Sequence, residues 1–490
     1  MDQVLLIERV MDQTRLAVIE DGALCEVYTQ WPDPENVTGN IYVGQVQNVV
    51  SGLDAAFIDI GMKKNGFLSG SDIVPRQKND DNLHPVSRQG RIDRIVHPGD
   101  RILVQAVRSQ PGAKGPRLSG HITLTGRKTV LLSDAYQVGV SHRIEDEQER
   151  RRLTAIGSDM VSDKGCGVIL RTAANGASAD SLKNEYERLY SEYTDFRRIG
   201  DFSAAPKLLH DDNDLLLQIA RDRINACVQE VWVDGDQAFD QLTHYMRLMS
   251  PEYLSIVKKH SGEVPLFDLF RVESQIGKAL ERVVRLKNGG TIVIEETEAF
   301  VSVDVNTGKY SGGQTADNTI VTTNCEAARE LMRQIRLRDL SGIIVVDFID
   351  MKRDQDRKRV LDVLDECARY DRNTVTIVGF TPLGLLELTR KRSRQSLSRQ
   401  LTRPCCACDG KGRIPSKDVT ARSAIRELWK RERRGEEQPL LLEADPAVCS
   451  CISSIGIPYK GGVEINAVTG YSDGGFRITT LQHPNGIPLK

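Results

Sequence analysis

Three polar residues near the ends of two predicted strands could hold a metal ion. Asp304 and Asn306 lie two residues apart in VSVDVNTG, so on a strand both side chains point to one face. Asp347 ends the apolar run GIIVV in the same way. A carboxylate at the end of a buried strand is costly unless it is paired or binds a cation, and Mg²⁺ prefers such oxygen ligands. We therefore expect Asp304 and Asp347 to bind magnesium, with Asn306 orienting a phosphate or an aspartate and Asp350 as a supporting residue.

A magnesium ion at this place would polarise a phosphate group and lower the pKa of an attacking water, which is the chemistry of phosphodiester hydrolysis. The alternative role for these aspartates is to cap the helices that follow the strands, as Asp often does.

A second candidate metal site is the cysteine cluster at residues 405–408. Cys405 and Cys408 have C-x-x-C spacing and are followed by Gly410 and Gly412, whereas a closed structural zinc site needs four ligands. No second C-x-x-C pair is present in the sequence, so two chains could each lend Cys405 and Cys408 to one zinc ion and form a homodimer. A redox pair or unligated thiols is the alternative.

Other residues have the chemistry of nucleic-acid contacts. Arg171 and Thr172 end a strand where small residues open a turn, a geometry that can grip a phosphate, although a strand-end arginine can also be a plain surface residue. Phe57 and Phe67 lie on two neighbouring predicted strands, near the arginines of SRQGRIDRIVHPGD. A cationic groove with aromatic platforms binds single-stranded nucleic acid. For Phe57, burial in the core is the alternative.

The elements that must position these residues form several domains. Residues 1–35 predict a β meander with a turn at Asp21-Gly22, and it should pair with a later segment because it is too small to fold alone. Residues 40–110 predict short strands in a small barrel of the OB type. Residues 119–215 mix strands with charged helices, and 211–285 predict helices and one short strand that could pack on the meander.

The C-terminal half predicts a layered α/β domain. A strand hairpin over 291–306 is followed by alternating helices and strands, and then by a basic helix in LLELTRKRSRQSLSRQL. The cysteine turn, one helix and a small α/β tail complete the chain.

Composition limits the class of protein. The chain has 490 residues, of which 40% are hydrophobic and 27% charged, and these values predict two or more globular domains. Its net charge is −2, so any site that binds a polyanion must be local. The sequence shows no secretion signal and no apolar run of about 20 residues, so we expect a cytoplasmic protein without a transmembrane segment.

Several motifs together make the chain resemble the RNase E/G family, and by its length RNase G or a minimal RNase E. They are NIYVGQV, AAFIDIG, NGFLSGSDI, VILRTAA, VPLFDLF, ETEAFVSVDVNTG, IRLRDLSGIIVVDFIDM, GLLELTRKR and CCACDGKGRI, and they run in order from about residue 40 to 413. The resemblance implies an RNase H-like subdomain (1–35 and 215–280), an inserted OB-fold (36–120), a 5′-sensor (121–214), a DNase I-like domain (281–400), a zinc link (401–416) and a small C-terminal domain (417–490).

The resemblance also implies roles for individual residues. Asp304 and Asp347 would be Mg²⁺ ligands beside Asn306. The pocket for an RNA 5′-monophosphate would consist of Gly126, Val130, Arg171 and Thr172. The RNA contacts of the OB domain would be Phe57, Phe67 and Lys114, and the zinc ligands shared between two chains would be Cys405 and Cys408. The family has Pro after the first cysteine, where this chain has Cys406.

The implied function is a magnesium-dependent endoribonuclease. It would cut single-stranded RNA at A/U-rich sites, favour 5′-monophosphorylated substrates, and act in rRNA and tRNA processing and mRNA decay as a homodimer or a dimer of dimers. The sequence lacks the long scaffold tail of large RNase E, so degradosome partners are not expected. The alternatives are a non-catalytic RNA-binding, ribosome-associated factor and a deoxyribonuclease.

Overall fold

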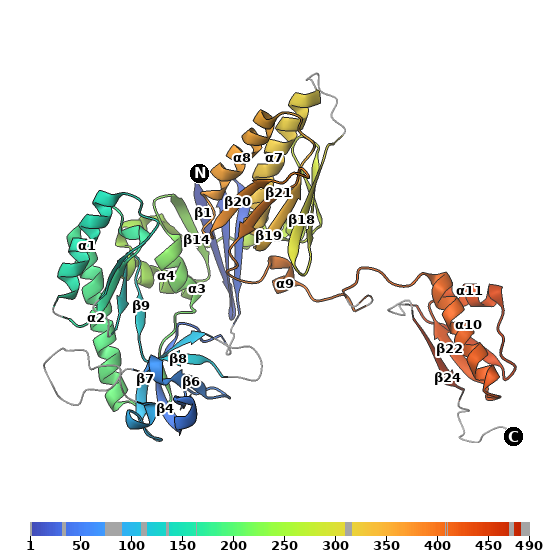
Figure 1. Cartoon of the computed structure of the whole chain (residues 1–490), viewed down its shortest axis with the longest axis horizontal. Coiled ribbons are helices and arrows are strands. Elements are labelled where there is room, and N and C mark those ends of the chain that lie inside the picture. Colours follow the sequence, from blue (N-terminus) through green and yellow to red (C-terminus); the bar gives the residue numbers. More distant parts are fainter. Residues whose placement is uncertain are drawn as a thin grey trace. The chain divides into compact units, whose positions relative to one another are not determined.

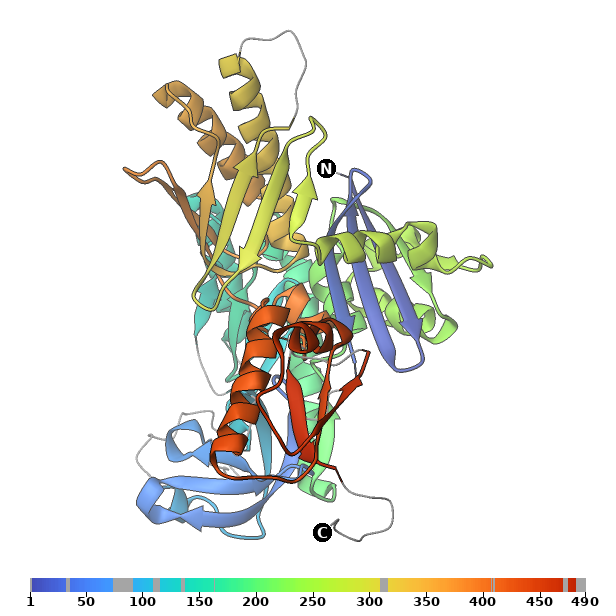
Figure 2. The same ribbon diagram turned by 90° about the vertical axis from the view of Figure 1, so that its right-hand side faces the viewer.

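A computed structural model describes residues 2–31, 36–73, 91–108, 115–133, 137–162, 164–308, 316–406, 408, 410–469 and 475–481. The chain is a mixed α/β protein that divides into two compact units, Met1–Arg394 and Gln395–Lys490. Unit 1 contains four sheets and unit 2 contains one (Figures 1 and 2). Within the described residues, no helix is both long and apolar enough to span a bilayer.

The N-terminal sheet joins the first strands of the chain to strands from beyond residue 225. Its order is β15-β14-β1-β2-β3, with β14 parallel to β1. The strands are β1 (Gln3–Val10), β2 (Gln13–Glu20), β3 (Ala23–Gln30), β14 (Val228–Asp234) and β15 (Val257–His260). Asp21 and Gly22 both have positive φ in the tight β2–β3 turn, as the Asp-Gly pair predicts. The prediction that the meander pairs with a later segment is confirmed.

Short helices pack on this sheet. They are α3 (Leu215–Gln218), the π-helix η5 (Ile219–Arg223), α4 (Asp236–Met249), η6 (Pro251–Ile256), α5 (Leu266–Leu269) and α6 (Val272–Ala279). Leu216, Ile219 and Leu242 join Leu5 and Val231 of the strands in one buried core. This burial supplies most of the stability of such short helices, because an isolated helix of this length is marginal in water.

The second sheet closes into the predicted barrel. β4 (Ile41–Val50) pairs with both β5 (Ala55–Asp59) and β7 (Arg101–Arg108), and β6 (Gly66–Ser69) and β8 (Arg117–Ser119) complete the ring. The short 3₁₀ turns η1 (Ser51–Leu53), η2 (Gly70–Asp72) and η3 (Ile92–Arg94) connect the strands, and β13 (Lys207–His210) adds to the outer edge of β4. A closed barrel of five strands is consistent with an OB-like domain.

The third sheet has the order β11-β12-β10-β9. Its strands are β9 (Thr123–Thr125), β10 (Thr129–Leu132), β11 (Val138–Val140) and β12 (Gly167–Leu170), followed by the turn η4 (Thr172–Ala174). Two helices, α1 (Glu147–Val161) and α2 (Ala179–Phe202), share its core. Asp146 and Ser178 cap these helices by accepting hydrogen bonds from backbone N–H groups of the first turn.

Among the described residues of unit 1, helices cover one face of the fourth sheet. Its order is β16-β17-β18-β19-β21-β20. The strands are β16 (Val283–Arg285), β17 (Thr291–Glu296), β18 (Phe300–Asn306), β19 (Gly342–Asp347), β20 (Val375–Phe380) and β21 (Leu386–Arg390). Helices α7 (Ala316–Leu337) and α8 (Asp354–Ala368) lie against one face, as Figure 1 shows. On the other face Phe300 is 42% exposed and Ile343 is 53% exposed.

The prediction of one basic helix over residues 385–401 is wrong. Residues 386–390 form β21, between β19 and β20, and only Leu397–Leu401 forms a helix, α9. Leu386, Leu388 and Arg390 alternate on the buried face of the strand. The Arg390 guanidinium is buried because it donates hydrogen bonds to Asp339 and Asp371. A run of basic residues is typical of a solvated helix. In this segment Arg390 is buried with its acidic partners, and the residues form a strand instead.

Unit 2 is a small α/β fold. A three-stranded sheet of β22 (Leu440–Ala444), β23 (Val463–Ala467) and β24 (Phe476–Thr480) packs on α10 (Lys417–Arg433) and α11 (Pro446–Ile455). Ala424, Leu428, Leu442 and Ile452 are buried between the helices and the sheet. The predicted small α/β tail is therefore present.

Candidate functional site

Asp304 and Asp347 lie side by side at the ends of two parallel strands. They are directly paired in the register of β18 and β19, so both side chains point to the same face of the fourth sheet. That face is the one that α7 and α8 leave open, and both carboxylates are exposed. The expected cost of burial therefore does not apply to either group. Their pairing across two strands is the feature that could attract a cation.

Asn306 contacts the same pair. Its Nδ2 donates a hydrogen bond to Oδ2 of Asp304 at 2.7 Å, so the amide can fix the orientation of that carboxylate. Asp350 lies beyond the end of β19 and is exposed. Within the described part of the chain, no group of three or more His, Cys, Asp or Glu residues could hold a metal. Two carboxylates and an amide fit Mg²⁺, which uses few protein oxygens and leaves other positions to water and phosphate.

Phe57 and Phe67 form an aromatic pair on the barrel. They face each other across β5 and β6, with ring centroids 6.0 Å apart in an edge-to-face arrangement. Both side chains are half-buried, so each ring has an accessible part. Lys114, the third predicted RNA contact, lies outside the described residues.

The structure brings Arg171 together with Gly126. Nη1 of Arg171 donates to the Gly126 carbonyl oxygen at 2.6 Å, and the backbone N–H of Arg171 donates to the Lys128 carbonyl at 2.8 Å. The hydroxyl of Thr172 shares a 3.0 Å hydrogen bond with Ser141. Val130 pairs with Ile169 in the same sheet. The four predicted pocket residues thus lie at one end of the central strands β10 and β12 and in the turns next to them.

Two carboxylates at this place have no counterpart in the sequence predictions. Glu185 of α2 accepts hydrogen bonds from the backbone N–H groups of Arg127, Lys128 and Thr129 at 2.8 to 2.9 Å, and so fixes the turn after Gly126. Asp222 of η5 accepts a 2.6 Å hydrogen bond from Nη2 of Arg171. Both partners are more than 50 residues away along the chain, so no local sequence pattern could identify them.

The cysteine turn in unit 2 has features of a metal-binding loop. Cys405 is exposed and Cys408 is half-buried. The Sγ of Cys408 accepts a hydrogen bond from the backbone N–H of Gly412 at 3.2 Å, so the backbone of the loop turns toward this sulfur. Gly410 and Gly412 both have positive φ, which lets the backbone turn around the sulfur. Cys406 is exposed next to Cys405.

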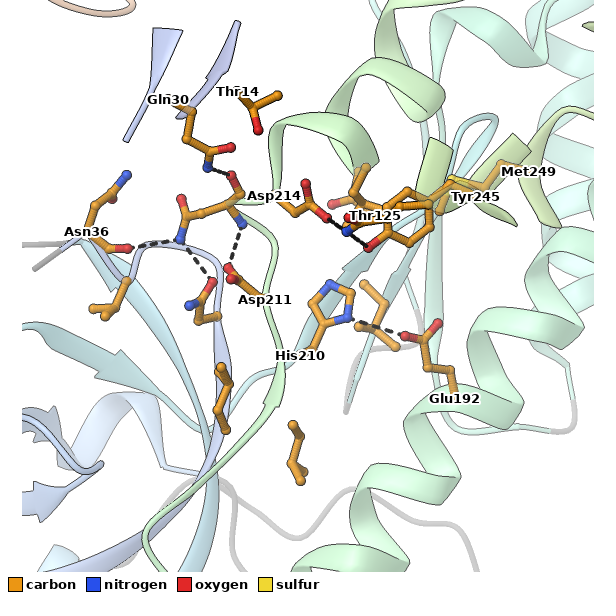
Figure 3. Close-up of a pocket in the computed structure, with 18 of the residues that line it drawn as sticks. Thr14, Gln30, Asn36, Thr125, Glu192, His210, Asp211, Asp214, Tyr245 and Met249 are labelled. Carbon is orange, nitrogen blue, oxygen red and sulfur yellow. Dashed lines mark hydrogen bonds and ion pairs between the residues drawn. The ribbon is translucent and has the colours of Figure 1, made fainter. Parts of the chain in front are cut away.

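A cavity of about 960 Å³ lies elsewhere in unit 1, between the N-terminal sheet, the barrel and α2. Figure 3 shows His210 at its wall, beside Glu192 of α2 and near Asp211 and Asp214. Burial lowers the pKa of His210, but the carboxylates of Asp212 and Glu192 more than offset this effect and raise it to about 9. None of the predicted site residues lines this cavity, so the volume of the cavity does not make it the candidate active site.

The predicted residues therefore form separate groups on separate sheets. The acidic pair lies on the fourth sheet, the aromatic pair on the barrel, and Arg171 at the end of β12 in the third sheet. An extended polymer can contact groups on several sheets at once, whereas a small ligand cannot.

Comparison with known proteins identifies the family. A sequence model described as the Ribonuclease E/G family matches residues 123–393. Ribonuclease G of Salmonella typhimurium (strain SL1344) is 36% identical over 451 residues, which cover 91% of this chain and 92% of that protein. Ribonuclease G of Haemophilus influenzae is 36% identical over 453 residues, covering 91% of each chain. Ribonuclease E of a Nostoc species is 37% identical over 379 residues, covering 76% of this chain and 54% of that protein.

The family model spans more than half of the chain and includes the strands that carry Arg171, Asp304 and Asp347. The resemblance found in the sequence motifs is confirmed over nearly the whole length. This chain therefore belongs to the Ribonuclease E/G family.

Proposed function

We propose that this chain is an endoribonuclease that hydrolyses single-stranded RNA with Mg²⁺ held by Asp304 and Asp347. The observation that carries the proposal is the in-register pairing of these two exposed carboxylates on parallel strands, within a chain of the Ribonuclease E/G family. The open face of the fourth sheet leaves them accessible to a polymer. The N-terminal, third and fourth sheets would then be the RNase H-like, 5′-sensor and DNase I-like parts.

Each residue of the acidic group would have its own task. The carboxylates of Asp304 and Asp347 would hold the ion, and Asn306 would keep the Asp304 carboxylate in one orientation through its 2.7 Å hydrogen bond. When bound, Mg²⁺ neutralises charge on the phosphate and lowers the pKa of a coordinated water. Because only two protein carboxylates are involved, one face of the site stays free for the RNA phosphate.

The barrel would bind the RNA on either side of the cut. Phe57 and Phe67 present ring surface on which bases can stack, and Lys114 would contact the backbone. Stacking is tolerant of sequence, so we assign the preference for A/U-rich sites to the ease with which such RNA stays single-stranded.

Arg171 and Thr172, with Gly126 and Val130, would bind a 5′-monophosphate. The guanidinium of Arg171 is held against the Gly126 carbonyl and is 30% exposed, so it can still reach a phosphate.

Cys405 and Cys408 of two chains would bind one structural zinc ion, giving a homodimer or a dimer of dimers. Natural roles in rRNA and tRNA processing and in mRNA decay belong to the same proposal.

The test is cleavage of a 5′-monophosphorylated, A/U-rich RNA with and without magnesium. Asp304→Asn and Asp347→Asn each remove one ligand charge with little change in shape, and we expect kcat to fall by about 100-fold or more while RNA binding persists. Asp354→Asn is the matched control, because this fully exposed carboxylate lies in the first turn of α8.

Two outcomes would overturn the proposal. Binding without cleavage by the wild-type protein in magnesium would indicate an RNA-binding, ribosome-associated factor that uses the barrel alone. Equal cleavage of DNA of the same sequence would indicate a deoxyribonuclease, because metal-bound carboxylates do not by themselves select the sugar.

A further inference from the structure

A carboxylate from a different part of unit 1 occupies one side of the proposed 5′-phosphate pocket. Asp222 belongs to the π-helix η5, which packs in the core of the N-terminal sheet and not in the third sheet. Its Oδ1 lies 2.6 Å from Nη2 of Arg171, and the two side chains are 26% and 30% exposed. The cation that would receive a phosphate is therefore already in contact with an anion.

Asp222 is held in this position from behind. Nε of Arg221 donates to its Oδ2 at 2.9 Å, and Nη1 of Arg221 donates to Asp212 at 2.5 Å. The Arg221 side chain is only 8% exposed. Asp212 in turn faces His210, which lines the cavity of Figure 3. Because Arg221 bridges two carboxylates and is buried, Asp222 cannot turn away from Arg171 without breaking this chain of ion pairs.

Arg171 is also held by hydrogen bonds that do not involve Asp222. Its Nη1 is bound to the Gly126 carbonyl, and its backbone N–H is bound to Lys128. Asp222 therefore contributes negative charge to the pocket more than it orients the Arg171 side chain. A phosphate that binds Arg171 comes within a few ångströms of this charge, well inside the Debye length of about 8 Å, so salt screens the repulsion only in part.

We propose that Asp222 sets the charge selectivity of the Arg171 pocket, so that it accepts a 5′-monophosphate and disfavours 5′ ends that carry more phosphates. The inference rests on the proposed function of Arg171 as a 5′-phosphate contact. Repulsion by a fixed carboxylate grows with the charge of the ligand. A monophosphate carries about −1.5 to −2 at neutral pH, and each additional phosphate adds to that charge.

The experiment compares one RNA with a 5′-hydroxyl, a 5′-monophosphate or a 5′-triphosphate end. Values of kcat/KM are measured for the wild type, Asp222→Asn and Asp222→Glu with each RNA. Each value is then divided by the kcat/KM of the same variant on the 5′-hydroxyl RNA, so that a loss of folded protein cancels. We expect Asp222→Asn to raise the triphosphate-to-monophosphate ratio by about threefold to tenfold, as for a partly exposed charge pair. Asp222→Glu keeps the charge and should keep the wild-type ratio.

Asp159→Asn is the matched control. It removes one carboxylate from α1 that pairs with Lys183, so it changes net charge equally without touching Arg171. It should leave the ratio at the wild-type value. The effect of Asp222→Asn should also shrink as salt is raised.

The outcomes separate the two proposals. If Arg171→Ala removes the advantage of the monophosphate end but Asp222→Asn leaves the triphosphate ratio unchanged or lowers it, the role of Asp222 is wrong and the sensor proposal stands. If Arg171→Ala leaves all three ends equally affected, the sensor itself is wrong.

Discussion

At the scale of single residues, the aromatic pair on the barrel gives the clearest test of RNA contact. Phe57→Ala and Phe67→Ala should each weaken binding of a short single-stranded RNA about 5- to 100-fold, because one stacked base contributes about 1–3 kcal/mol. Binding is measured in an Asp304→Asn background, which prevents cleavage during the titration.

Phe→Leu variants separate stacking from core packing at the same positions. Leucine keeps most of the apolar volume but has no ring face, so it should restore the melting temperature and leave RNA binding weak. If leucine restores RNA binding as well, the two rings act only as core residues. The slope of affinity against salt should stay at the wild-type value, because no charge is removed.

The sequence singled out the acidic residues but not the physical reason for their pairing. Spacing placed Asp304 and Asn306 on one face of a strand, and Asp347 at the end of another. The adjacency of the two strands comes from sheet order, which a local pattern does not encode. Asp222, the carboxylate partner of Arg171, was missed for the same reason, since it lies 51 residues away along the chain.

At the scale of elements, alternation and turn chemistry predicted most strands correctly. The Asp21-Gly22 hairpin, the barrel strands and the 291–306 hairpin are all present. One element with a buried charge was predicted wrongly. β21 resembles a basic helix because its cations look solvated, although Arg390 is paired with Asp339 and Asp371 inside the protein. These acidic partners lie far from Arg390 in sequence, so the local pattern could not reveal that β21 is buried.

The ion pairs around His210 predict how stability depends on pH where β13 meets α2. His210 is flanked by Glu192 at 3.4 Å and Asp212 at 3.8 Å, packs near the ring of Phe196, and has Arg221 on the far side of Asp212. Its pKa rises from 6.5 to about 9. A folded-state pKa above the unfolded value stabilises the protein fully below the unfolded pKa, and this contribution is lost as pH rises through the folded value.

The wild-type protein should therefore be more stable than His210→Gln at pH 6, and the difference should shrink steadily between about pH 6.5 and 9. Melting temperatures of both proteins across this range provide the measurement. A difference that stays constant with pH would show that His210 contributes packing alone. Ser203→Ala, at the half-buried C-cap position that follows α2, is a control for substitutions near the same elements.

At the scale of the whole molecule, buried ion pairs connect parts of unit 1 that are far apart in sequence. Arg336 of α7 is 7% exposed and donates two 2.7 Å hydrogen bonds to Glu20 and further bonds to Glu26. Burial raises the pKa of Glu26, but the charges of Arg223 and Arg336 prevail and hold it far below its usual range. The fourth sheet is thereby fixed to the N-terminal sheet through specific charges, which sequence composition could not predict.

Under the proposed zinc link, assembly of whole chains would depend on unit 2. If one zinc ion joins two chains, Cys405→Ala and Cys408→Ala should each lower both the bound zinc and the sedimentation mass, whereas Cys227→Ala, which removes an exposed thiol in unit 1, should lower neither. Cys406→Ala decides which thiols bind: zinc is retained if Cys405 and Cys408 are the ligands, and reduced if Cys406 takes part. Because a four-thiolate site shared by two chains is incomplete in a monomer, zinc loss and dissociation must occur together. A protein that keeps its mass after losing its zinc would contradict the shared site, and the oligomer would then have to be held by another surface.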